Sequence, residues 1–145
     1  MSLKSVIASL FGGAEEIVSL EKLTLRTGGM RICTVREIVM KDGAAEVTLY
    51  EERHKDGAFF LEPVKRAVCE ASRVTELLNE SRLISWDGFA GKHPRGVKDG
   101  TTFSLEATVN GGRKISAHGS QNFPKRYRIL TDGIRNILES GDATG

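Results

Sequence analysis

Cysteine, proline and tryptophan are scarce in this chain of 145 residues, which contains two, three and one of them respectively. Cys33 and Cys69 lie far apart, without CxxC spacing, so the sequence predicts ordinary thiols in a reducing compartment rather than a disulfide framework. The histidines at 54, 93 and 118 form no i,i+4 pair and no HExxH pattern. We therefore expect no metal site and no cofactor.

Long apolar runs and a strong charge of one sign are also missing. No apolar run approaches the roughly 20 residues of a membrane helix, and the formal net charge of +2 is too small to indicate nucleic acid. Hydrophobic residues make up 39% and charged residues 28%, which is typical of a globular domain. We expect a cytoplasmic domain without a membrane or nucleic-acid partner. Residues 1–14 are expected to form an N-terminal arm or short helix, because they lack a signal-peptide cleavage site.

Glycine is frequent, and its positions divide the first half of the chain into strands. Residues 17–27, 30–40 and 44–54 alternate apolar and polar side chains and end at Gly-Gly or Asp-Gly, which favour two-residue hairpin turns. Such turns place Leu23 opposite Thr34 and Ile38 opposite Val47. Residues 58–62 add a fourth strand. One face of the predicted sheet is apolar, and it carries Leu23, Leu25, Ile32, Ile38, Met40, Val47 and Leu49.

The second half of the chain predicts two helices and one hairpin. Residues 64–81 have a helical apolar period after Pro63, and residues 124–140 have another after Pro124. Between them come a long loop, 84–100, and two alternating segments, 101–109 and 113–118, joined by a three-residue turn. We predict a single α+β domain over residues 15–140, with helices on one face of an antiparallel sheet. We expect residues 141–145 to form a frayed tail.

The segment HGSQNFP at 118–124 allows three interpretations. The first is structural, with Ser120 or Asn122 capping a helix that begins at Pro124. The second is a hydrolase or transferase in which His118 activates Ser104 or Ser120, although no G-x-S-x-G elbow is present. The third is an anion site, because cations crowd the first helical turn, where the helix dipole disfavours them.

The long loop is the other candidate for function, because structureless loops beyond about 12–15 residues are uncommon in compact domains. Trp86 and Phe89 begin it, and cations follow them. These aromatic residues either pin the loop to the core or offer a platform to an anionic ligand.

Three motifs in the last part of the chain carry a resemblance. They are W-x-G-F at 86–89, D-G-T-x-F-x-L at 99–105 and A-x-G-S-x-N-F-P at 117–124. In order and spacing they resemble a bacterial family of uncharacterised α+β domains that is common in Firmicutes and gut anaerobes. The resemblance implies a glycine-aromatic loop, a hairpin and a proline-started helix, and it implies no particular chemistry. The basic start of the last helix departs from the usual pattern of that family.

Taken together, these patterns favour a small binding or interaction module over an enzyme. The expected ligand is an anion or an acidic partner, held where the long loop meets the last helix. The alternatives are an enzyme that uses His118, and a homo-oligomer joined through the mixed sheet face or an edge strand. The predicted ligand-binding residues are Trp86, Lys92, His93, Arg95, His118, Ser120, Lys125 and Arg126.

Overall fold

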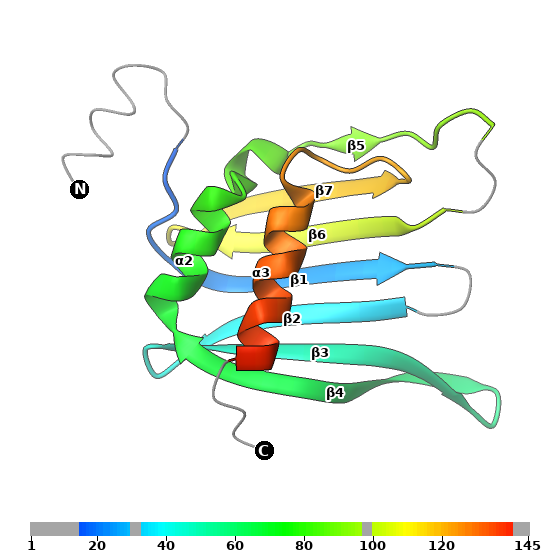
Figure 1. Cartoon of the computed structure of the whole chain (residues 1–145), viewed down its shortest axis with the longest axis horizontal. Coiled ribbons are helices and arrows are strands. Elements are labelled where there is room, and N and C mark those ends of the chain that lie inside the picture. The colour runs from blue at the N-terminus through cyan, green and yellow to red at the C-terminus, as the bar shows by residue number, and fades with distance from the viewer. Residues whose placement is uncertain (1–14, 30–32, 97–99, 141–145) are drawn as a thin grey trace.

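Seven strands form one sheet in the part of the chain that the computed structural model describes, which is residues 15–29, 33–96 and 100–140. The strand order is β4-β3-β2-β1-β6-β7-β5 (Figure 1). All neighbours are antiparallel except β5 and β7, which run parallel. The strands are β1 Leu20–Gly28, β2 Cys33–Lys41, β3 Ala44–Lys55, β4 Ala58–Glu70, β5 Ala90–Gly91, β6 Thr102–Val109 and β7 Arg113–Ser120.

Two α-helices lie on the same face of this sheet, as the sequence predicts. They are α2, Ala71–Glu80, and α3, Tyr127–Ser140, and a 3-10 turn η1 spans Leu83–Trp86. Figure 1 shows both helices in front of the strands, with part of the same sheet face left open beside α3. The α+β class is therefore correct. The expected four-stranded meander and separate hairpin are instead parts of one larger mixed sheet, because β6 pairs with β1.

Turn chemistry fixes two of the predicted registers. Asp42 and Gly43 have φ of 52° and 80°, and Ile38 pairs with Val47 as expected. Asn110, Gly111 and Gly112 also have positive φ, and the β6–β7 pairing of Ala107 with Ile115 confirms the three-residue turn.

The predicted register between the first two strands is wrong. Leu23 pairs with Ile38 rather than with Thr34, because the connection is longer than a two-residue turn at Gly28-Gly29. The shift is an even number of residues, so the same side chains still face the core.

Residues 64–70 continue β4 and do not begin a helix. Their apolar positions fit a helical period, but Ala67 and Cys69 also alternate along a strand and face the helices through their pairing with Val47 and Ala45. Pro63 is tolerated because β4 is an edge strand, where one side of the backbone needs no partner. The helix begins only at Ala71.

The last helix and the long loop also differ from the prediction. Pro124 precedes the helix, since Arg126 has a left-handed φ of 68° and α3 starts at Tyr127. The amides of Ile129 and Leu130 donate to the carbonyl of Arg126, and in the described part of the chain Ser120 and Asn122 bond to His93 and Lys92 rather than to this helix end. The segment expected to be structureless contains η1 and β5.

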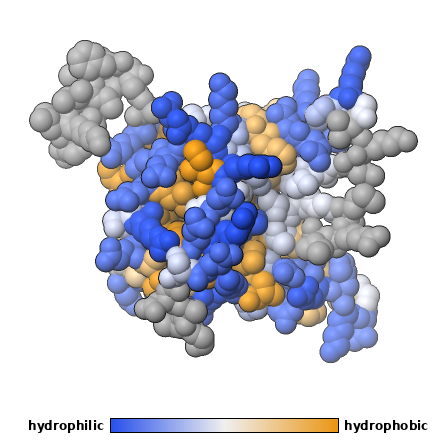
Figure 2. All heavy atoms as spheres, in the orientation of Figure 1, coloured by the Kyte–Doolittle hydropathy of each residue, from blue (hydrophilic) through white to orange (hydrophobic). Residues whose placement is uncertain are grey.

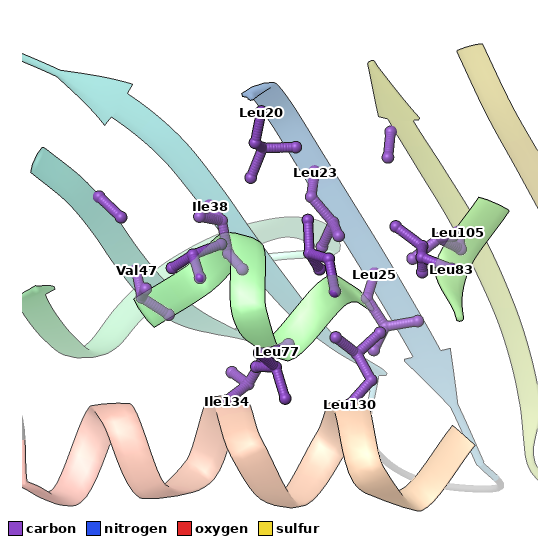
Figure 3. Close-up of a cluster of buried hydrophobic side chains, with 14 of the residues drawn as sticks. Leu20, Leu23, Leu25, Ile38, Val47, Leu77, Leu83, Leu105, Leu130 and Ile134 are labelled. Atoms are coloured by element: carbon purple, nitrogen blue, oxygen red, sulfur yellow. The ribbon is translucent and has the colours of Figure 1, made fainter. Parts of the chain in front are cut away.

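The core lies between the sheet and the two helices (Figure 3). Side chains from both layers meet there with no exposed surface, among them Leu25 and Ile38 from the sheet and Leu130 and Ile134 from α3. Met40 and Leu49 of the predicted face pack against this core while half-buried. The predicted Ile32 lies outside the described residues, as do the arm at 1–14 and the tail at 141–145. Within the described ranges, no helix is both long and apolar enough to cross a membrane.

On the sheet face away from the helices, the sequence predicts a mixed surface that includes Val18, Leu20 and Val35. Leu20 points into the core instead, because a bulge between Leu20 and Lys22 shifts the alternation of β1. Val35 does lie on the far face but is 4% exposed, since neighbouring side chains cover it. Val18 is exposed and precedes the first strand.

Candidate functional site

Of the predicted aromatic platform, Trp86 is part of the core and Phe89 packs against it while partly buried. Trp86 is 1% exposed, and its indole Nε1 donates a hydrogen bond to the carbonyl of Ser81 at 3.0 Å. Its ring lies 6.0 Å from that of Tyr127, between centroids. Trp86 therefore anchors η1 against the first residue of α3 and offers no surface to a ligand, unlike the platform that the sequence suggests.

Arg126 joins the two helices. Its guanidinium Nη1 donates to the carbonyl of Glu80, the last residue of α2, at 2.9 Å. A cation at a helix C-terminus interacts favourably with the helix dipole. Part of the positive charge that the sequence places at the start of α3 thus stabilises the end of α2.

The serine and histidines of the predicted site separate into two groups. The Nδ1 of His93 lies 2.8 Å from the Oγ of Ser120, which joins the loop after β5 to the end of β7. His118 is exposed on the sheet face opposite the helices, with Ser104 as its cross-strand neighbour. Among the described residues the His118 ring makes no side-chain hydrogen bond, so the geometry shows no nucleophile activated by His118.

The remaining predicted residues are exposed and spread out. Lys92 and Arg95 follow β5, and the carbonyl of Lys92 accepts a hydrogen bond from Asn122 at 3.4 Å. Lys125 is exposed before α3. The structure therefore does not gather the eight predicted residues into one site.

A different hollow lies against α3. It is an open cleft of about 900 Å³, and of the predicted residues it includes Arg126. Its size is within the range of small-molecule sites, roughly 300–1,000 Å³. Aromatic, hydroxyl and cationic side chains line it together: Thr101, Phe123, Pro124, Arg126, Tyr127, Arg128, Ile129, Thr131, Asp132 and Arg135.

Arg36 lies next to this cleft, on the helix-facing side of β2. Its position follows from alternation, because Arg36 shares a strand face with the buried Ile38. Burial lowers the pKa of the Arg36 guanidinium; Tyr127 opposes the shift, and the positive charge of Arg135 lowers the pKa further. Both of these partners line the cleft.

The Arg36 guanidinium has little compensation within the described residues. Its Nη1 lies 3.4 Å from the Thr27 hydroxyl, and in the described part of the chain no carboxylate is within ion-pair distance of it. A guanidinium carries five N–H donors. Arg36 therefore has unused hydrogen-bonding capacity at a half-buried position.

The cleft itself has an excess of positive charge. Its lining contains three arginines and one carboxylate, Asp132, which accepts from Arg135 at 3.0 Å. Arg128 has no ion-pair partner among the described residues. Hydrophilic side chains also dominate the visible surface over α3 in Figure 2. The arrangement can accept an anion and can stack or enclose an apolar group against Phe123 and Tyr127.

The cysteines add no reactive centre to the cleft. Burial raises the pKa of the Cys69 thiol, with Arg73 opposing, so the nucleophilic thiolate is disfavoured. Cys33 and Cys69 are both free. No cluster of metal-binding side chains occurs in the ranges that the structure describes.

Sequence reasoning missed Arg36, although one signal was available. In the predicted sheet, Arg36 alternates with Ile38 and Met40 on the apolar face. A charged residue there marks either the edge of the core or a functional position. The closeness of Arg36 to Arg135 depends on how α3 lies over the sheet, and no local sequence pattern predicts that arrangement.

Comparison with known proteins gives a weak similarity to one class of enzyme. No family model matches the chain. It is 24% identical over 135 residues to truncated formate dehydrogenase 2 of Saccharomyces cerevisiae (strain ATCC 204508 / S288c), covering 92% of this chain and 57% of that protein. It is also 24% identical to formate dehydrogenase 1 of S. cerevisiae strain YJM789, covering 92% of this chain and 36% of that protein. The chain thus spans little more than half, or about a third, of these proteins.

Proposed function

We propose that this protein is a binding module for an anionic ligand, which it holds in the cleft beside α3. The observation that carries the proposal is the half-buried Arg36 guanidinium without a neighbouring carboxylate among the described residues. The proposal keeps the ligand class that the sequence suggests. It moves the site from the loop junction to the cleft.

The half-buried Arg36 guanidinium raises the free energy of the protein in two ways. A charged group that is removed from water and left without a partner costs free energy. At this position the positive charge of Arg135 adds to that cost. A phosphate or carboxylate between Arg36 and the arginines of α3 would offset both the burial of the Arg36 charge and its repulsion from Arg135. Charge-assisted hydrogen bonds to guanidinium are among the strongest in proteins.

The similarity to formate dehydrogenases suggests formate as one ligand to test. The names of those proteins refer to formate, which is a small anion. An identity of 24% over part of their length does not bring their activity to this chain, so formate is one ligand to test among others. The enzyme alternative based on His118 gains no support from its exposed position.

A thermal-shift screen of the full chain at low salt tests the proposal. The compounds are inorganic phosphate, nucleoside monophosphates, phosphosugars, formate and an acidic peptide. We expect one class of anion to raise the melting temperature, since a ligand at a hundred times its Kd adds about 2.7 kcal/mol to the free energy of unfolding. Raising the salt concentration should weaken the effect.

Matched variants locate the site. Arg36→Met should abolish the stabilisation by the anion, and without ligand it should raise the free energy of unfolding by about 1 kcal/mol by removing an uncompensated charge. Arg26→Met is the control, because Arg26 is an exposed arginine on the neighbouring strand. Lys125→Ala should leave the response intact. If no anion stabilises the wild type, or if Arg36→Met retains the response, the proposal is wrong.

A further inference from the structure

The edge strand β4 presents apolar side chains and one free side of its backbone to solvent. Phe59 and Phe60 are 65% and 47% exposed, and Leu61 and Val64 are 37% and 39% exposed. Among the strands that the structure describes, β4 pairs with β3 alone, at the end of the sheet. An exposed edge strand with apolar side chains is a template for pairing with another strand, and a bulge, a proline or a charge along it limits which strand can pair.

A bulge in β4 restricts which strand can pair with it. The pairing with β3 shifts between Leu49 and Tyr50, so Lys65 lies opposite Leu49 while Pro63 lies opposite Tyr50. Before the bulge, Phe60 and Glu62 share the helix side of the sheet, and beyond it Lys65 and Ala67 do so. A regular strand paired with this edge would therefore keep its side chains on the matching faces of the sheet on one side of the bulge only.

We propose that the partner is a second copy of β4, paired antiparallel across a two-fold axis with Pro63 of one copy opposite Val64 of the other. In this register both strands change face at the same level, so helix-side residues meet helix-side residues along the whole strand. A two-fold interface is self-complementary by symmetry. The two sheets then continue into one another.

Charge and apolar contacts agree with this register. Glu62 lies opposite Lys65 of the second copy on the helix side, and symmetry repeats the pair. Phe59 lies opposite Val68 on the far side. Moving the register by two residues in either direction would put the two bulges at different levels and would take Lys65 away from Glu62. Pro63, which has no N–H to donate, falls at the centre of the interface, where the bulge already interrupts the ladder.

Sedimentation equilibrium of the full chain tests the pairing, with circular dichroism to confirm folding. The wild type should reach twice the mass of one chain as the protein concentration rises. Lys65→Glu should weaken the dimer about tenfold, because it replaces two opposite-charge pairs by two like-charge pairs. Glu62→Lys should do the same, and the double variant Glu62→Lys/Lys65→Glu should restore dimerisation.

The double variant is the decisive measurement, because rescue requires the two side chains to meet across the interface. In the monomer Glu62 pairs with Arg53 at 2.9 Å in an exposed contact, which contributes little to folding. Val64→Arg, which places two arginines at the two-fold axis, is a second way to break the dimer. A wild type that stays monomeric, a dimer that survives both Lys65→Glu and Val64→Arg, or a double variant without rescue would overturn the proposal.

Discussion

The helix-facing side of the sheet is covered along one part of its strands and open along the other. On β1, Leu23 and Leu25 are fully buried under the helices, whereas Thr27 on the same face is half-buried. On β2, Ile38 is fully buried and Arg36 is partly open. The change from aliphatic to polar side chains therefore marks where the helices stop, and the candidate cleft lies at that border.

The largest expected effect comes from a substitution on the covered side. Leu25→Ala should lower the free energy of unfolding by about 2–5 kcal/mol, because it removes fully buried methyl groups and leaves a cavity. Thr27→Ala, two residues further along the same face, should cost about 1 kcal/mol or less. Urea denaturation measures both. Similar losses at the two positions would show that the open part of the face is as tightly packed as the covered part.

A substitution at Trp86 should give an intermediate effect and separate packing from binding. Trp86→Phe leaves the Ser81 carbonyl without its buried indole donor and should cost about 1–3 kcal/mol. It should leave any anion response of the cleft unchanged, since Trp86 lies in the core. Comparing the ligand-induced shifts in melting temperature of this variant and of Arg36→Met tests whether core packing and anion binding are independent. A response lost in both variants would mean that the core and the cleft act as one unit.

The smallest expected effect is a pH dependence at the border itself. Burial raises the pKa of Tyr127, with Arg36 opposing. The unfolded chain therefore loses the phenol proton first, and stability should fall as pH rises beyond the ordinary tyrosine value of about 10. Denaturation curves at several alkaline pH values should show this decline weakened in Tyr127→Phe.

The comparison should be made in a Cys69→Ser background, because burial also raises the pKa of the Cys69 thiol. The stability that depends on this thiol is lost in an overlapping alkaline range, by the same sign argument. An identical decline with and without the Tyr127 hydroxyl would show that Tyr127 is as well hydrated in the folded chain as in the unfolded one.

Local turn chemistry explains which parts of the fold the sequence predicts. Asp42-Gly43 and Asp56-Gly57 adopt the positive φ values that tight hairpins require, so the hairpins follow from residues adjacent in the chain. The sequence does not predict the end of β4 correctly in the segment from Val64 to Glu70. Its short apolar pattern fits both a strand and a helix, and no turn residue separates β4 from α2.

The site was harder to predict than the fold because it depends on contacts between distant segments. The sequence places Arg126 beside a helix start, but the Glu80 carbonyl that it binds belongs to the other helix. Likewise, Arg36 is identifiable as a charged residue on an apolar face, whereas its closeness to Arg135 follows only from the crossing of α3 over the sheet. The charge-rich segments predict an anionic ligand, which stays a prediction, and they do not point to the cleft beside α3.

The central position of β1 has a consequence for how the protein is made. β1 pairs on one side with β2, its neighbour in the chain, and on the other with β6, which lies far along it. On the ribosome the first four strands can assemble well before residues 102–109 emerge. Until then β1 is itself an edge with one unpaired side, so the nascent chain is open to foreign strands at a place that the finished molecule conceals.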